Sequence, residues 1–190
     1  MRPATAVVAE LLSQIAPYDE LERHHIATTL DWLHSTDDIF RRQRPGIPSP
    51  HLAVYVVMID AEARGVYLGC HRLAGLEIPT GGHVEPGEHP TAAAHREACE
   101  ELGITPRFDV VGEEPVFVTV GTVATTPPHI DVSLWYVIRG DRRRQYALDP
   151  AEFNGGRWWD LDPYGLPDTD PHLPRFLRKL DTILLPQEPQ

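Results

Sequence analysis

The chain has 190 residues, of which 42% are hydrophobic and 24% charged, and its formal net charge at pH 7 is -11. This composition is typical of a folded globular protein and excludes a wholly disordered chain. An acidic surface repels a phosphate backbone, so we expect no long nucleic acid as a partner. The acidic charge does not exclude a small phosphorylated ligand, because a bound divalent cation inverts the local electrostatic potential.

The two cysteines, Cys70 and Cys99, lack the spacing of a thiolate metal site and are typical of a reducing compartment. No segment approaches the roughly 20 apolar residues that span a bilayer. We therefore expect a cytoplasmic protein without a membrane segment.

Two helices are predicted in residues 1–43. Apolar residues recur at helical spacing in the first helix, which Pro17 ends, and Asp19 is a suitable N-cap for a second helix. The inward-facing residues are predicted to be Val7, Val8, Leu11, Leu12 and Ile15 in the first helix and Ile26, Leu30 and Leu33 in the second. A helical hairpin must bury its apolar stripe, so this extension is expected to cover a sheet, shape a pocket or form a homodimer contact.

Residues 44–50, RPGIPSP, are predicted to be a linker. Residues 51–186 then form the predicted main domain, followed by a tail at 187–190. Strands are predicted at 51–60, 66–71, 116–120, 130–138 and 156–160, the first two as a hairpin. A closing helix is predicted from about His172, with a stripe of Leu173, Phe176, Leu177, Leu180, Ile183 and Leu184. Mixed strands with few helices indicate an α+β or α/β sandwich.

A further helix is predicted from Pro90 to a stop at Gly103. It carries Glu97, Glu100 and Glu101 at i, i+3 and i+4, so their side chains converge. A solvated surface helix would place a cation four residues after Glu97. Two of the carboxylates also lie in the last turn, where the helix dipole disfavours negative charge. Clustered carboxylates suit Mg²⁺ or Mn²⁺. A metal site and a solvated charged face are therefore both open interpretations of these three glutamates.

The loop before this helix contains three glycines around Pro86, which indicates turns that approach a ligand closely. An ion pair between Glu88 and Arg96 would hold this loop against the helix. Residues 82–104 contain a spaced set of glycines, charged and apolar residues: Gly82, Glu88, Arg96, Glu97, Ala98, Glu100, Glu101, Gly103 and Ile104. The identity and spacing of these residues resemble the signature of the Nudix hydrolase family. The seven defined residue types match by chance at about one in 10⁸ per starting position.

The resemblance implies an α/β fold, the Nudix-like α/β/α sandwich around a mixed sheet, here with an N-terminal helical extension. It implies metal-dependent hydrolysis of a phosphoanhydride in a nucleoside diphosphate linked to a further group X. The substrate would be a small molecule such as a nucleoside triphosphate, a nucleotide sugar or ADP-ribose. By position, Glu97, Glu100, Glu101 and the Gly82 carbonyl would hold Mg²⁺ or Mn²⁺, and Arg96 and Glu88 would orient them.

One carboxylate must accept a proton from the attacking water. Glu100 and Glu101 are the first candidates for this base. The family sometimes supplies the base from a loop outside the signature, and the candidates there are Glu113, Glu114, Asp131 and Glu152.

The strand HIDVSLWYVI alternates, with His129, Asp131 and Trp135 on one face. We expect this face, with Phe117, to bind substrate. Phe117, Trp135, Trp158 or Trp159 would stack on a base. A solvated strand end and core aromatic residues are the alternatives. His83, His89 and His95 are interpreted as surface residues or as neighbours of the site.

Two other functions share the fold. A nucleotide-sensing domain would bind without cleavage, although such domains usually lack signature glutamates that are present here. A prenyl diphosphate isomerase would need a reactive cysteine, for which Cys70 is the candidate. An mRNA-decapping role is disfavoured by the acidic charge.

Overall fold

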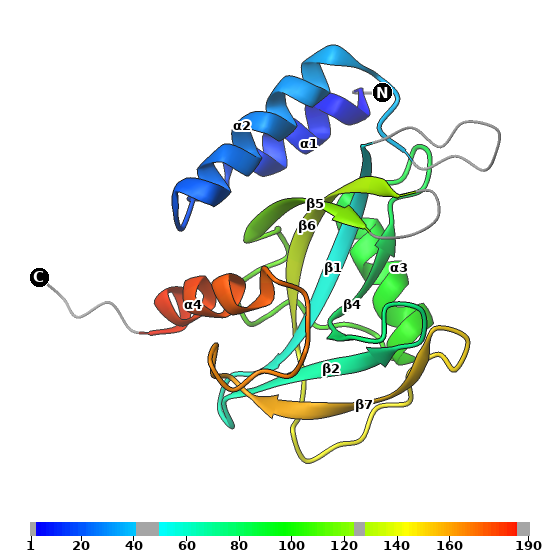
Figure 1. Ribbon diagram of the computed structural model, residues 1–190, viewed down its shortest axis with the longest axis vertical. Coiled ribbons are helices and arrows are strands. Elements are labelled where there is room, and N and C mark those ends of the chain that lie inside the picture. Colours follow the sequence, from blue (N-terminus) through cyan, green and yellow to red (C-terminus); the bar gives the residue numbers. More distant parts are fainter. Residues whose placement is uncertain (1–2, 41–49, 124–127, 186–190) are drawn as a thin grey trace, which may run out of the picture. The chain divides into compact units, whose positions relative to one another are not determined.

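The structure, a computed structural model, describes residues 3–40, 50–123 and 128–185 (Figure 1). The helices are α1 (Ala4–Ser13), α2 (Glu20–Ser35), α3 (Pro90–Leu102) and α4 (Leu173–Leu184). The strands are β1 (His51–Asp60), β2 (Gly65–His71), β3 (Glu77–Ile78), β4 (Thr80–His83), β5 (Phe117–Val123), β6 (His129–Arg139) and β7 (Phe153–Asp160). All predicted helices and strands are present, and β3 and β4 are additional.

The seven strands form one mixed sheet in the order β3-β2-β1-β6-β5, with β4 paired to β1 and β7 paired to β2. The predicted hairpin of β1 and β2 is antiparallel, with Met58 opposite Tyr67. β5 and β6 are also antiparallel, and Gly121 lies opposite Asp131. The predicted α/β class is thereby confirmed. In the described part of the chain, no helix combines the length and apolar character that a bilayer crossing requires.

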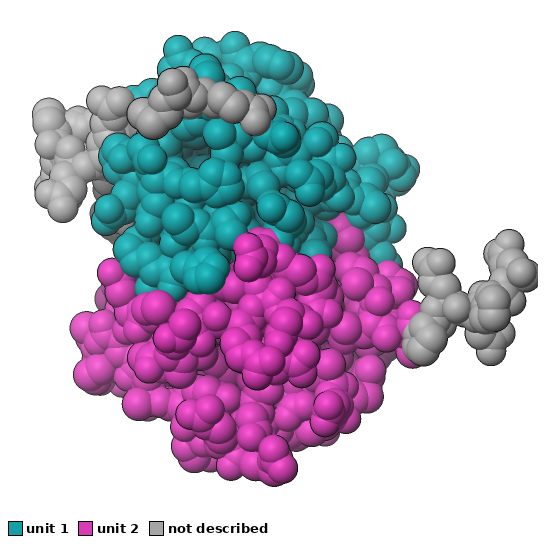
Figure 2. Space-filling view, turned by 180° about the vertical axis from the view of Figure 1, so that it is seen from behind, with its two compact units in different colours: residues 1–56, 81–97, 114–136 teal, residues 57–80, 98–113, 137–190 magenta. Residues whose placement is uncertain are grey.

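The chain divides into two compact units, which are coloured separately in Figure 2. The first contains residues 1–56, 81–97 and 114–136, and the second contains residues 57–80, 98–113 and 137–190. In the first unit, α1 packs against α2, and α2 packs against β5. The N-terminal helices are thus attached to the same unit as the loop before α3.

Asp19 caps α2 as predicted, because its Oδ1 accepts a hydrogen bond from the Glu22 N–H at 2.8 Å. The buried face of this helix differs from the prediction. Ile26 and Leu30 are only half-buried, whereas the buried positions are Glu22, His25, Thr29 and Leu33. Local hydrogen bonds make this polar face tolerable, since Glu22 accepts the Tyr18 N–H and Thr29 donates to the His25 carbonyl.

The N-terminal domain boundary stays a prediction. Most of the predicted linker at 44–50, and the whole tail at 187–190, lie outside the described residues.

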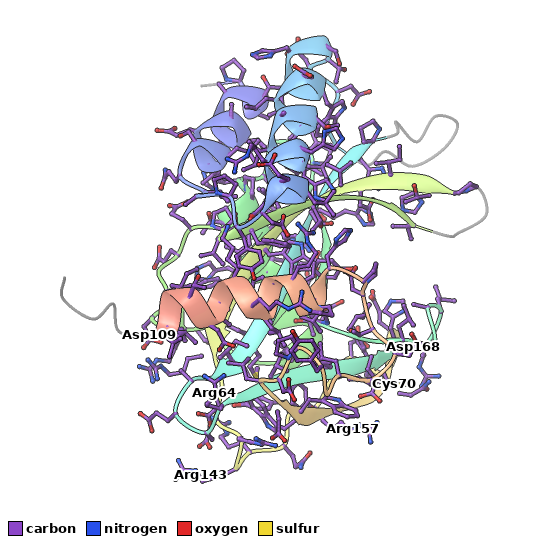
Figure 3. The ribbon with its side chains drawn as sticks, turned by 60° about the vertical axis from the view of Figure 1, so that its left-hand side comes forward. Arg64, Cys70, Asp109, Arg143, Arg157 and Asp168 are labelled. Atoms are coloured by element: carbon purple, nitrogen blue, oxygen red, sulfur yellow. The ribbon has the colours of Figure 1, made fainter. Side chains whose placement is uncertain are left out.

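The second unit contains an antiparallel ladder of β3, β2 and β7. Figure 3 labels Arg157 on β7, with Cys70 and Asp168 of the same unit. Arg157 donates a hydrogen bond to Glu77 of β3 through Nε at 3.0 Å, and Trp159 donates to the same carboxylate at 2.8 Å. α4 buries most of its predicted stripe, but Ile183 near its C-terminal end is 43% exposed.

Candidate active site

The loop before α3 turns at Glu85–Glu88. The Glu88 N–H donates to the Glu85 carbonyl at 2.9 Å, and Gly87 has a φ of 83°. Pro86 followed by a residue with positive φ is the pattern of a type II turn, which glycine favours because it has no Cβ. The predicted turn is present, and it brings the Glu88 side chain back toward the helix.

Arg96 joins this loop to α3. Its guanidinium donates to Glu88 at two positions, from Nε at 3.0 Å and from Nη2 at 2.9 Å. Nη1 donates to Glu97 Oε1 at 2.7 Å, and Nη2 also donates to the His83 carbonyl at 3.0 Å. One planar cation therefore fixes the loop backbone, the turn carboxylate and the first helix carboxylate, which is the geometry that arginine suits best.

Glu88 remains ionised in this arrangement. Burial alone would raise the pKa of Glu88, but hydrogen bonds from Arg96 and from the Glu85 N–H, with the guanidinium charge, outweigh burial and lower the pKa below its ordinary 4.5. The predicted pair of Glu88 and Arg96 is therefore present as a charge-assisted, bidentate contact.

Gly82 lies directly against Glu97. A Cβ added to Gly82 would lie 2.6 Å from Cδ of Glu97, closer than real Cβ atoms approach a neighbour. The carboxylate thus occupies the space that any other residue at position 82 would fill. A backbone carbonyl and a carboxylate from these two residues are hard oxygen donors, so the local arrangement fits Mg²⁺ or Mn²⁺.

α3 places its carboxylates in different environments. Glu97 and Glu101 are buried, at 8% and 4% exposed, whereas Glu100 is exposed. Three further residues form the predicted apolar stripe and are all buried: Ala94, Ala98 and Leu102. Two buried carboxylates one turn apart are costly unless cations or hydrogen bonds compensate them.

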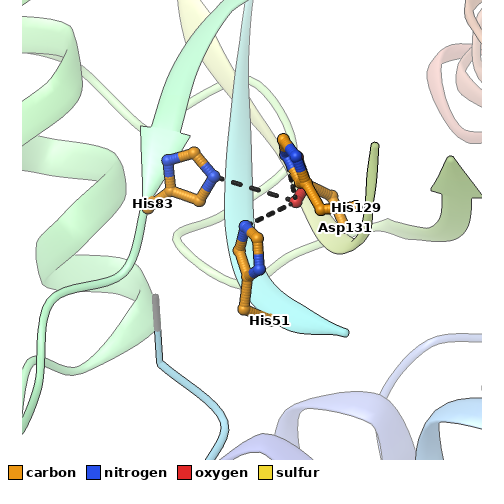
Figure 4. Close-up of side chains that lie close together, drawn as sticks. All are labelled: His51, His83, His129 and Asp131. Atoms are coloured by element: carbon orange, nitrogen blue, oxygen red, sulfur yellow. Dashed lines mark ion pairs between the residues drawn. The ribbon is translucent and has the colours of Figure 1, made fainter. Parts of the chain in front are cut away.

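A second polar cluster lies in the same unit as the loop (Figure 4). His51, His83, His129 and Asp131 bring one ligand atom each within 4.8 Å of one another. Asp131 Oδ1 lies 2.8 Å from Nε2 of His51, 3.7 Å from Nε2 of His83 and 3.4 Å from Nε2 of His129. The four residues come from β1, β4 and β6, and His83 also supplies the carbonyl that holds Arg96.

Asp131 is ionised in this cluster. Burial would raise the pKa of Asp131, but the close imidazoles of His51 and His83 outweigh burial and hold the pKa well below its ordinary 3.8. The carboxylate is thus an anionic group within a ring of imidazoles.

The predicted aromatic residues pack in the interior. Trp135 and Phe117 are both fully buried, and their ring centroids lie 5.7 Å apart. The indole N–H of Trp135 donates to Thr119 Oγ1 at 2.9 Å. Stacking on a base would require either ring to gain exposed surface, so their substrate-binding role stays a prediction.

The alternative bases are dispersed. Glu113, Glu114 and Glu152 are exposed, and Asp131 belongs to the histidine cluster. None of these positions distinguishes one residue as the base.

The strand pattern predicts a site role for His129 and Asp131 but none for His51, and His83 is expected to be a surface residue or a neighbour of the site. A common signal was present, because each histidine stands at the end of a strand. His51 begins β1, His83 ends β4 and His129 begins β6. Only the strand order shows that these three ends meet.

Comparison with known proteins supports the same family. The family model described as "NUDIX domain" matches residues 49–180. No protein of curated function matched the sequence.

Solved structures show the fold. A NUDIX-family hydrolase from Clostridium perfringens is 23% identical, with a TM-score of 0.54, over 72% of this chain and 99% of that one. The E. coli dihydroneopterin triphosphate pyrophosphohydrolase is 17% identical, with a TM-score of 0.55, over 77% of this chain and 98% of that one. A C. elegans Ap4A hydrolase is 20% identical, with a TM-score of 0.52, over 70% and 96% of the two chains.

These neighbours share the predicted α/β/α sandwich. The family match extends over most of the chain and includes β4, which holds Gly82, and α3, which holds Arg96 and the three glutamates. The chain therefore belongs to the NUDIX family and is a Nudix hydrolase.

Proposed function

We propose that the protein hydrolyses a phosphoanhydride bond in a small nucleoside diphosphate linked to a further group, with water attacking phosphorus. Mg²⁺ or Mn²⁺ would be held by Glu97, Glu100, Glu101 and the Gly82 carbonyl. The contact between Gly82 and Glu97 supports this assignment most strongly, because glycine leaves the Glu97 carboxylate the space that a side chain at position 82 would fill.

Bound divalent cations would neutralise the diphosphate and acidify the attacking water. Arg96 would keep Glu97 in one orientation through the 2.7 Å bond, while Glu88 holds Arg96 from the other side. Glu100 or Glu101 would accept the proton of the water. Glu100 is exposed and accessible to solvent, whereas Glu101 is buried, so the two differ in how readily a solvent proton reaches them.

The names of two structural neighbours support the substrate class. Dihydroneopterin triphosphate and Ap4A, which those names mention, both contain phosphoanhydride bonds. They leave the identity of the group beyond the diphosphate open.

The test is hydrolysis of a panel of nucleoside triphosphates, nucleotide sugars, ADP-ribose and dinucleoside polyphosphates with Mg²⁺ or Mn²⁺, with both products identified by mass. Glu100→Gln and Glu101→Gln are each expected to lower turnover at least about a hundredfold while the fold is retained. Glu62→Gln removes an exposed carboxylate outside α3 and serves as the control for net charge. Wild-type rates in both α3 variants would contradict the assignment, and nucleotide binding without any product would indicate a sensing domain instead.

A further inference from the structure

We propose that His51, His83, His129 and Asp131 form a second metal site, separate from the carboxylates of α3 and selective for Zn²⁺. The four ligand atoms are already gathered within 4.8 Å of one another (Figure 4). Three imidazoles and one carboxylate are a donor set that zinc accepts in proteins.

The three distances from Asp131 are close to those of four-coordinate geometry. Zinc bonds to imidazole nitrogen and carboxylate oxygen are about 2.0–2.2 Å long, so neighbouring ligand atoms of a tetrahedron lie roughly 3.3 Å apart. The three distances from Asp131 Oδ1 to the imidazole nitrogens are 2.8, 3.4 and 3.7 Å. Small side-chain adjustments would bring all three to the tetrahedral value.

The environment also suits a bound ion. The side chain of His51 is fully buried, those of His129 and Asp131 are 10% and 17% exposed, and that of His83 is 28% exposed. The centroids of the His51 and His129 rings lie 4.8 Å apart, and those of the His51 and His83 rings lie 4.7 Å apart. Three ring nitrogens thus surround one carboxylate oxygen, and imidazole nitrogen and carboxylate oxygen are both ligands that zinc accepts.

A hydrogen-bonded cluster is the competing explanation. Asp131 Oδ1 faces three imidazoles at once, and the 3.4 and 3.7 Å separations from His129 and His83 exceed the usual hydrogen-bond length. The remaining contact, between His51 Nε2 and Asp131 Oδ1 at 2.8 Å, joins two buried atoms that lack hydrogen-bond geometry. A shared ion accounts for all three contacts.

This donor set discriminates between metals. Mg²⁺ prefers oxygen ligands, as in the proposed site on α3, whereas imidazole favours Zn²⁺ over Mg²⁺. The chain would thus present two donor sets of different selectivity.

His83 links the proposed zinc site to the loop before α3. Its backbone carbonyl accepts a hydrogen bond from Arg96 at 3.0 Å, and the preceding residue, Gly82, contacts Glu97. An ion held by His51 on β1 and by His129 and Asp131 on β6 would anchor His83, and with it the end of β4, to these two strands. The metal would act structurally, as expected for a zinc ion with four protein ligands.

The experiment is a Zn²⁺ titration of the full chain after chelator treatment and dialysis, by calorimetry, in the presence of excess Mg²⁺. We expect one Zn²⁺ per chain, a rise in Tm on binding, and a zinc X-ray absorption spectrum with imidazole scattering. His83→Gln and Asp131→Asn should each weaken Zn²⁺ binding by roughly a hundredfold or more, because even outer-shell changes cost about 10–100-fold.

His34→Gln is the matched control, since His34 is exposed on α2 and outside the cluster. Glu100→Gln tests for binding at α3, and both control variants should bind Zn²⁺ like the wild type. No Zn²⁺ uptake by the wild type, equal uptake by His83→Gln, or loss of uptake in Glu100→Gln would each overturn the proposal. If Asp131→Asn does not fold, the partly exposed His83 still decides the question. None of these readouts depends on hydrolysis, so the test is independent of the proposed activity.

Discussion

The backbone of Gly82 lies against the carboxylate of Glu97, so that a Cβ at position 82 would come within 2.6 Å of Glu97 Cδ. Glu97 is in turn held by Arg96 Nη1 at 2.7 Å. The Glu97 carboxylate therefore packs against the backbone of Gly82 on one side and is hydrogen-bonded to the Arg96 guanidinium on the other. The confinement orients one donor of the proposed Mg²⁺ site before any ion binds, which is how supporting contacts tune a metal ligand.

Gly82→Ala should reduce hydrolysis about 10–100-fold and raise the Mg²⁺ concentration needed for half-maximal rate, because the new methyl group displaces the Glu97 carboxylate. The displaced group is the end of a flexible side chain, so the free energy of unfolding should fall by less than about 1 kcal/mol. Rates as a function of Mg²⁺, with a denaturant titration, check both expectations.

Gly87→Ala is the matched control with the opposite expected result. Position 87 has a φ of 83° and open space around it, so alanine adds strain but no clash. Stability should fall by about 1 kcal/mol, with the Mg²⁺ dependence unchanged. If both glycine variants lose the same activity with the same Mg²⁺ response, the special role of Gly82 is wrong.

Arg96→Lys should lower both stability and activity, although the charge is kept. Lysine cannot reproduce two parallel bonds to Glu88 together with bonds to Glu97 and the His83 carbonyl. We expect a loss of about 1–3 kcal/mol in the free energy of unfolding and at least a tenfold loss in kcat.

Arg107→Lys provides the comparison for Arg96→Lys. Arg107 pairs with Asp109 at 2.5 Å, but its side chain is 69% exposed. Its replacement should change stability by no more than about 0.5 kcal/mol. Equal effects of the two substitutions would show that the bonds of Arg96 are not special.

Glu77→Gln should reduce the acid sensitivity of the second unit. A hydrogen bond from Arg157 is the main cause that lowers the pKa of Glu77 below its ordinary 4.5; burial opposes the shift, and a hydrogen bond from Trp159 adds to it. A lowered folded-state pKa means that the stabilisation is present above pH 4.5 and is lost as the pH falls through the folded value. Arg157 is largely exposed, so we expect its pair with Glu77 to contribute only about 1 kcal/mol to the free energy of unfolding. Urea titrations of the wild type and the variant should therefore converge between about pH 5 and pH 3. Curves that stay parallel over this range would contradict the linkage.

Trp135→Phe separates a packing role from base stacking. The ring is fully buried and its N–H donates to Thr119. We expect a loss of about 1–3 kcal/mol of stability and a KM for nucleotide within about twofold of the wild type. A severalfold rise in KM at unchanged stability would instead favour the stacking role predicted from the strand pattern.

The sequence predicts the elements of the fold that depend on residues close together in the chain. The spacing of Arg96, Glu97, Glu100 and Glu101 fixes their arrangement on α3, because an α-helix has the same 3.6-residue turn wherever it packs. The N-cap at Asp19, the turn around Gly87 and the strand of 51–60 likewise depend on a few neighbouring residues.

The sequence did not predict which face of α2 is buried. Its apolar residues predicted an inward face containing Ile26 and Leu30, but Glu22, His25 and Thr29 occupy the buried positions. Polar side chains can be buried when nearby backbone groups satisfy them, and whether they are buried depends on what the helix packs against.

The sequence by itself determined the turn before α3 and the helix that carries the three proposed glutamate ligands, since those residues lie close together in the chain and obey helix and turn geometry. Only the tertiary structure decided that His51, His83 and His129 meet at Asp131, and that Trp135 is buried. Those contacts join the ends of strands far apart in the chain. The order of strands in a sheet is set by the packing of the whole domain, which no local pattern specifies.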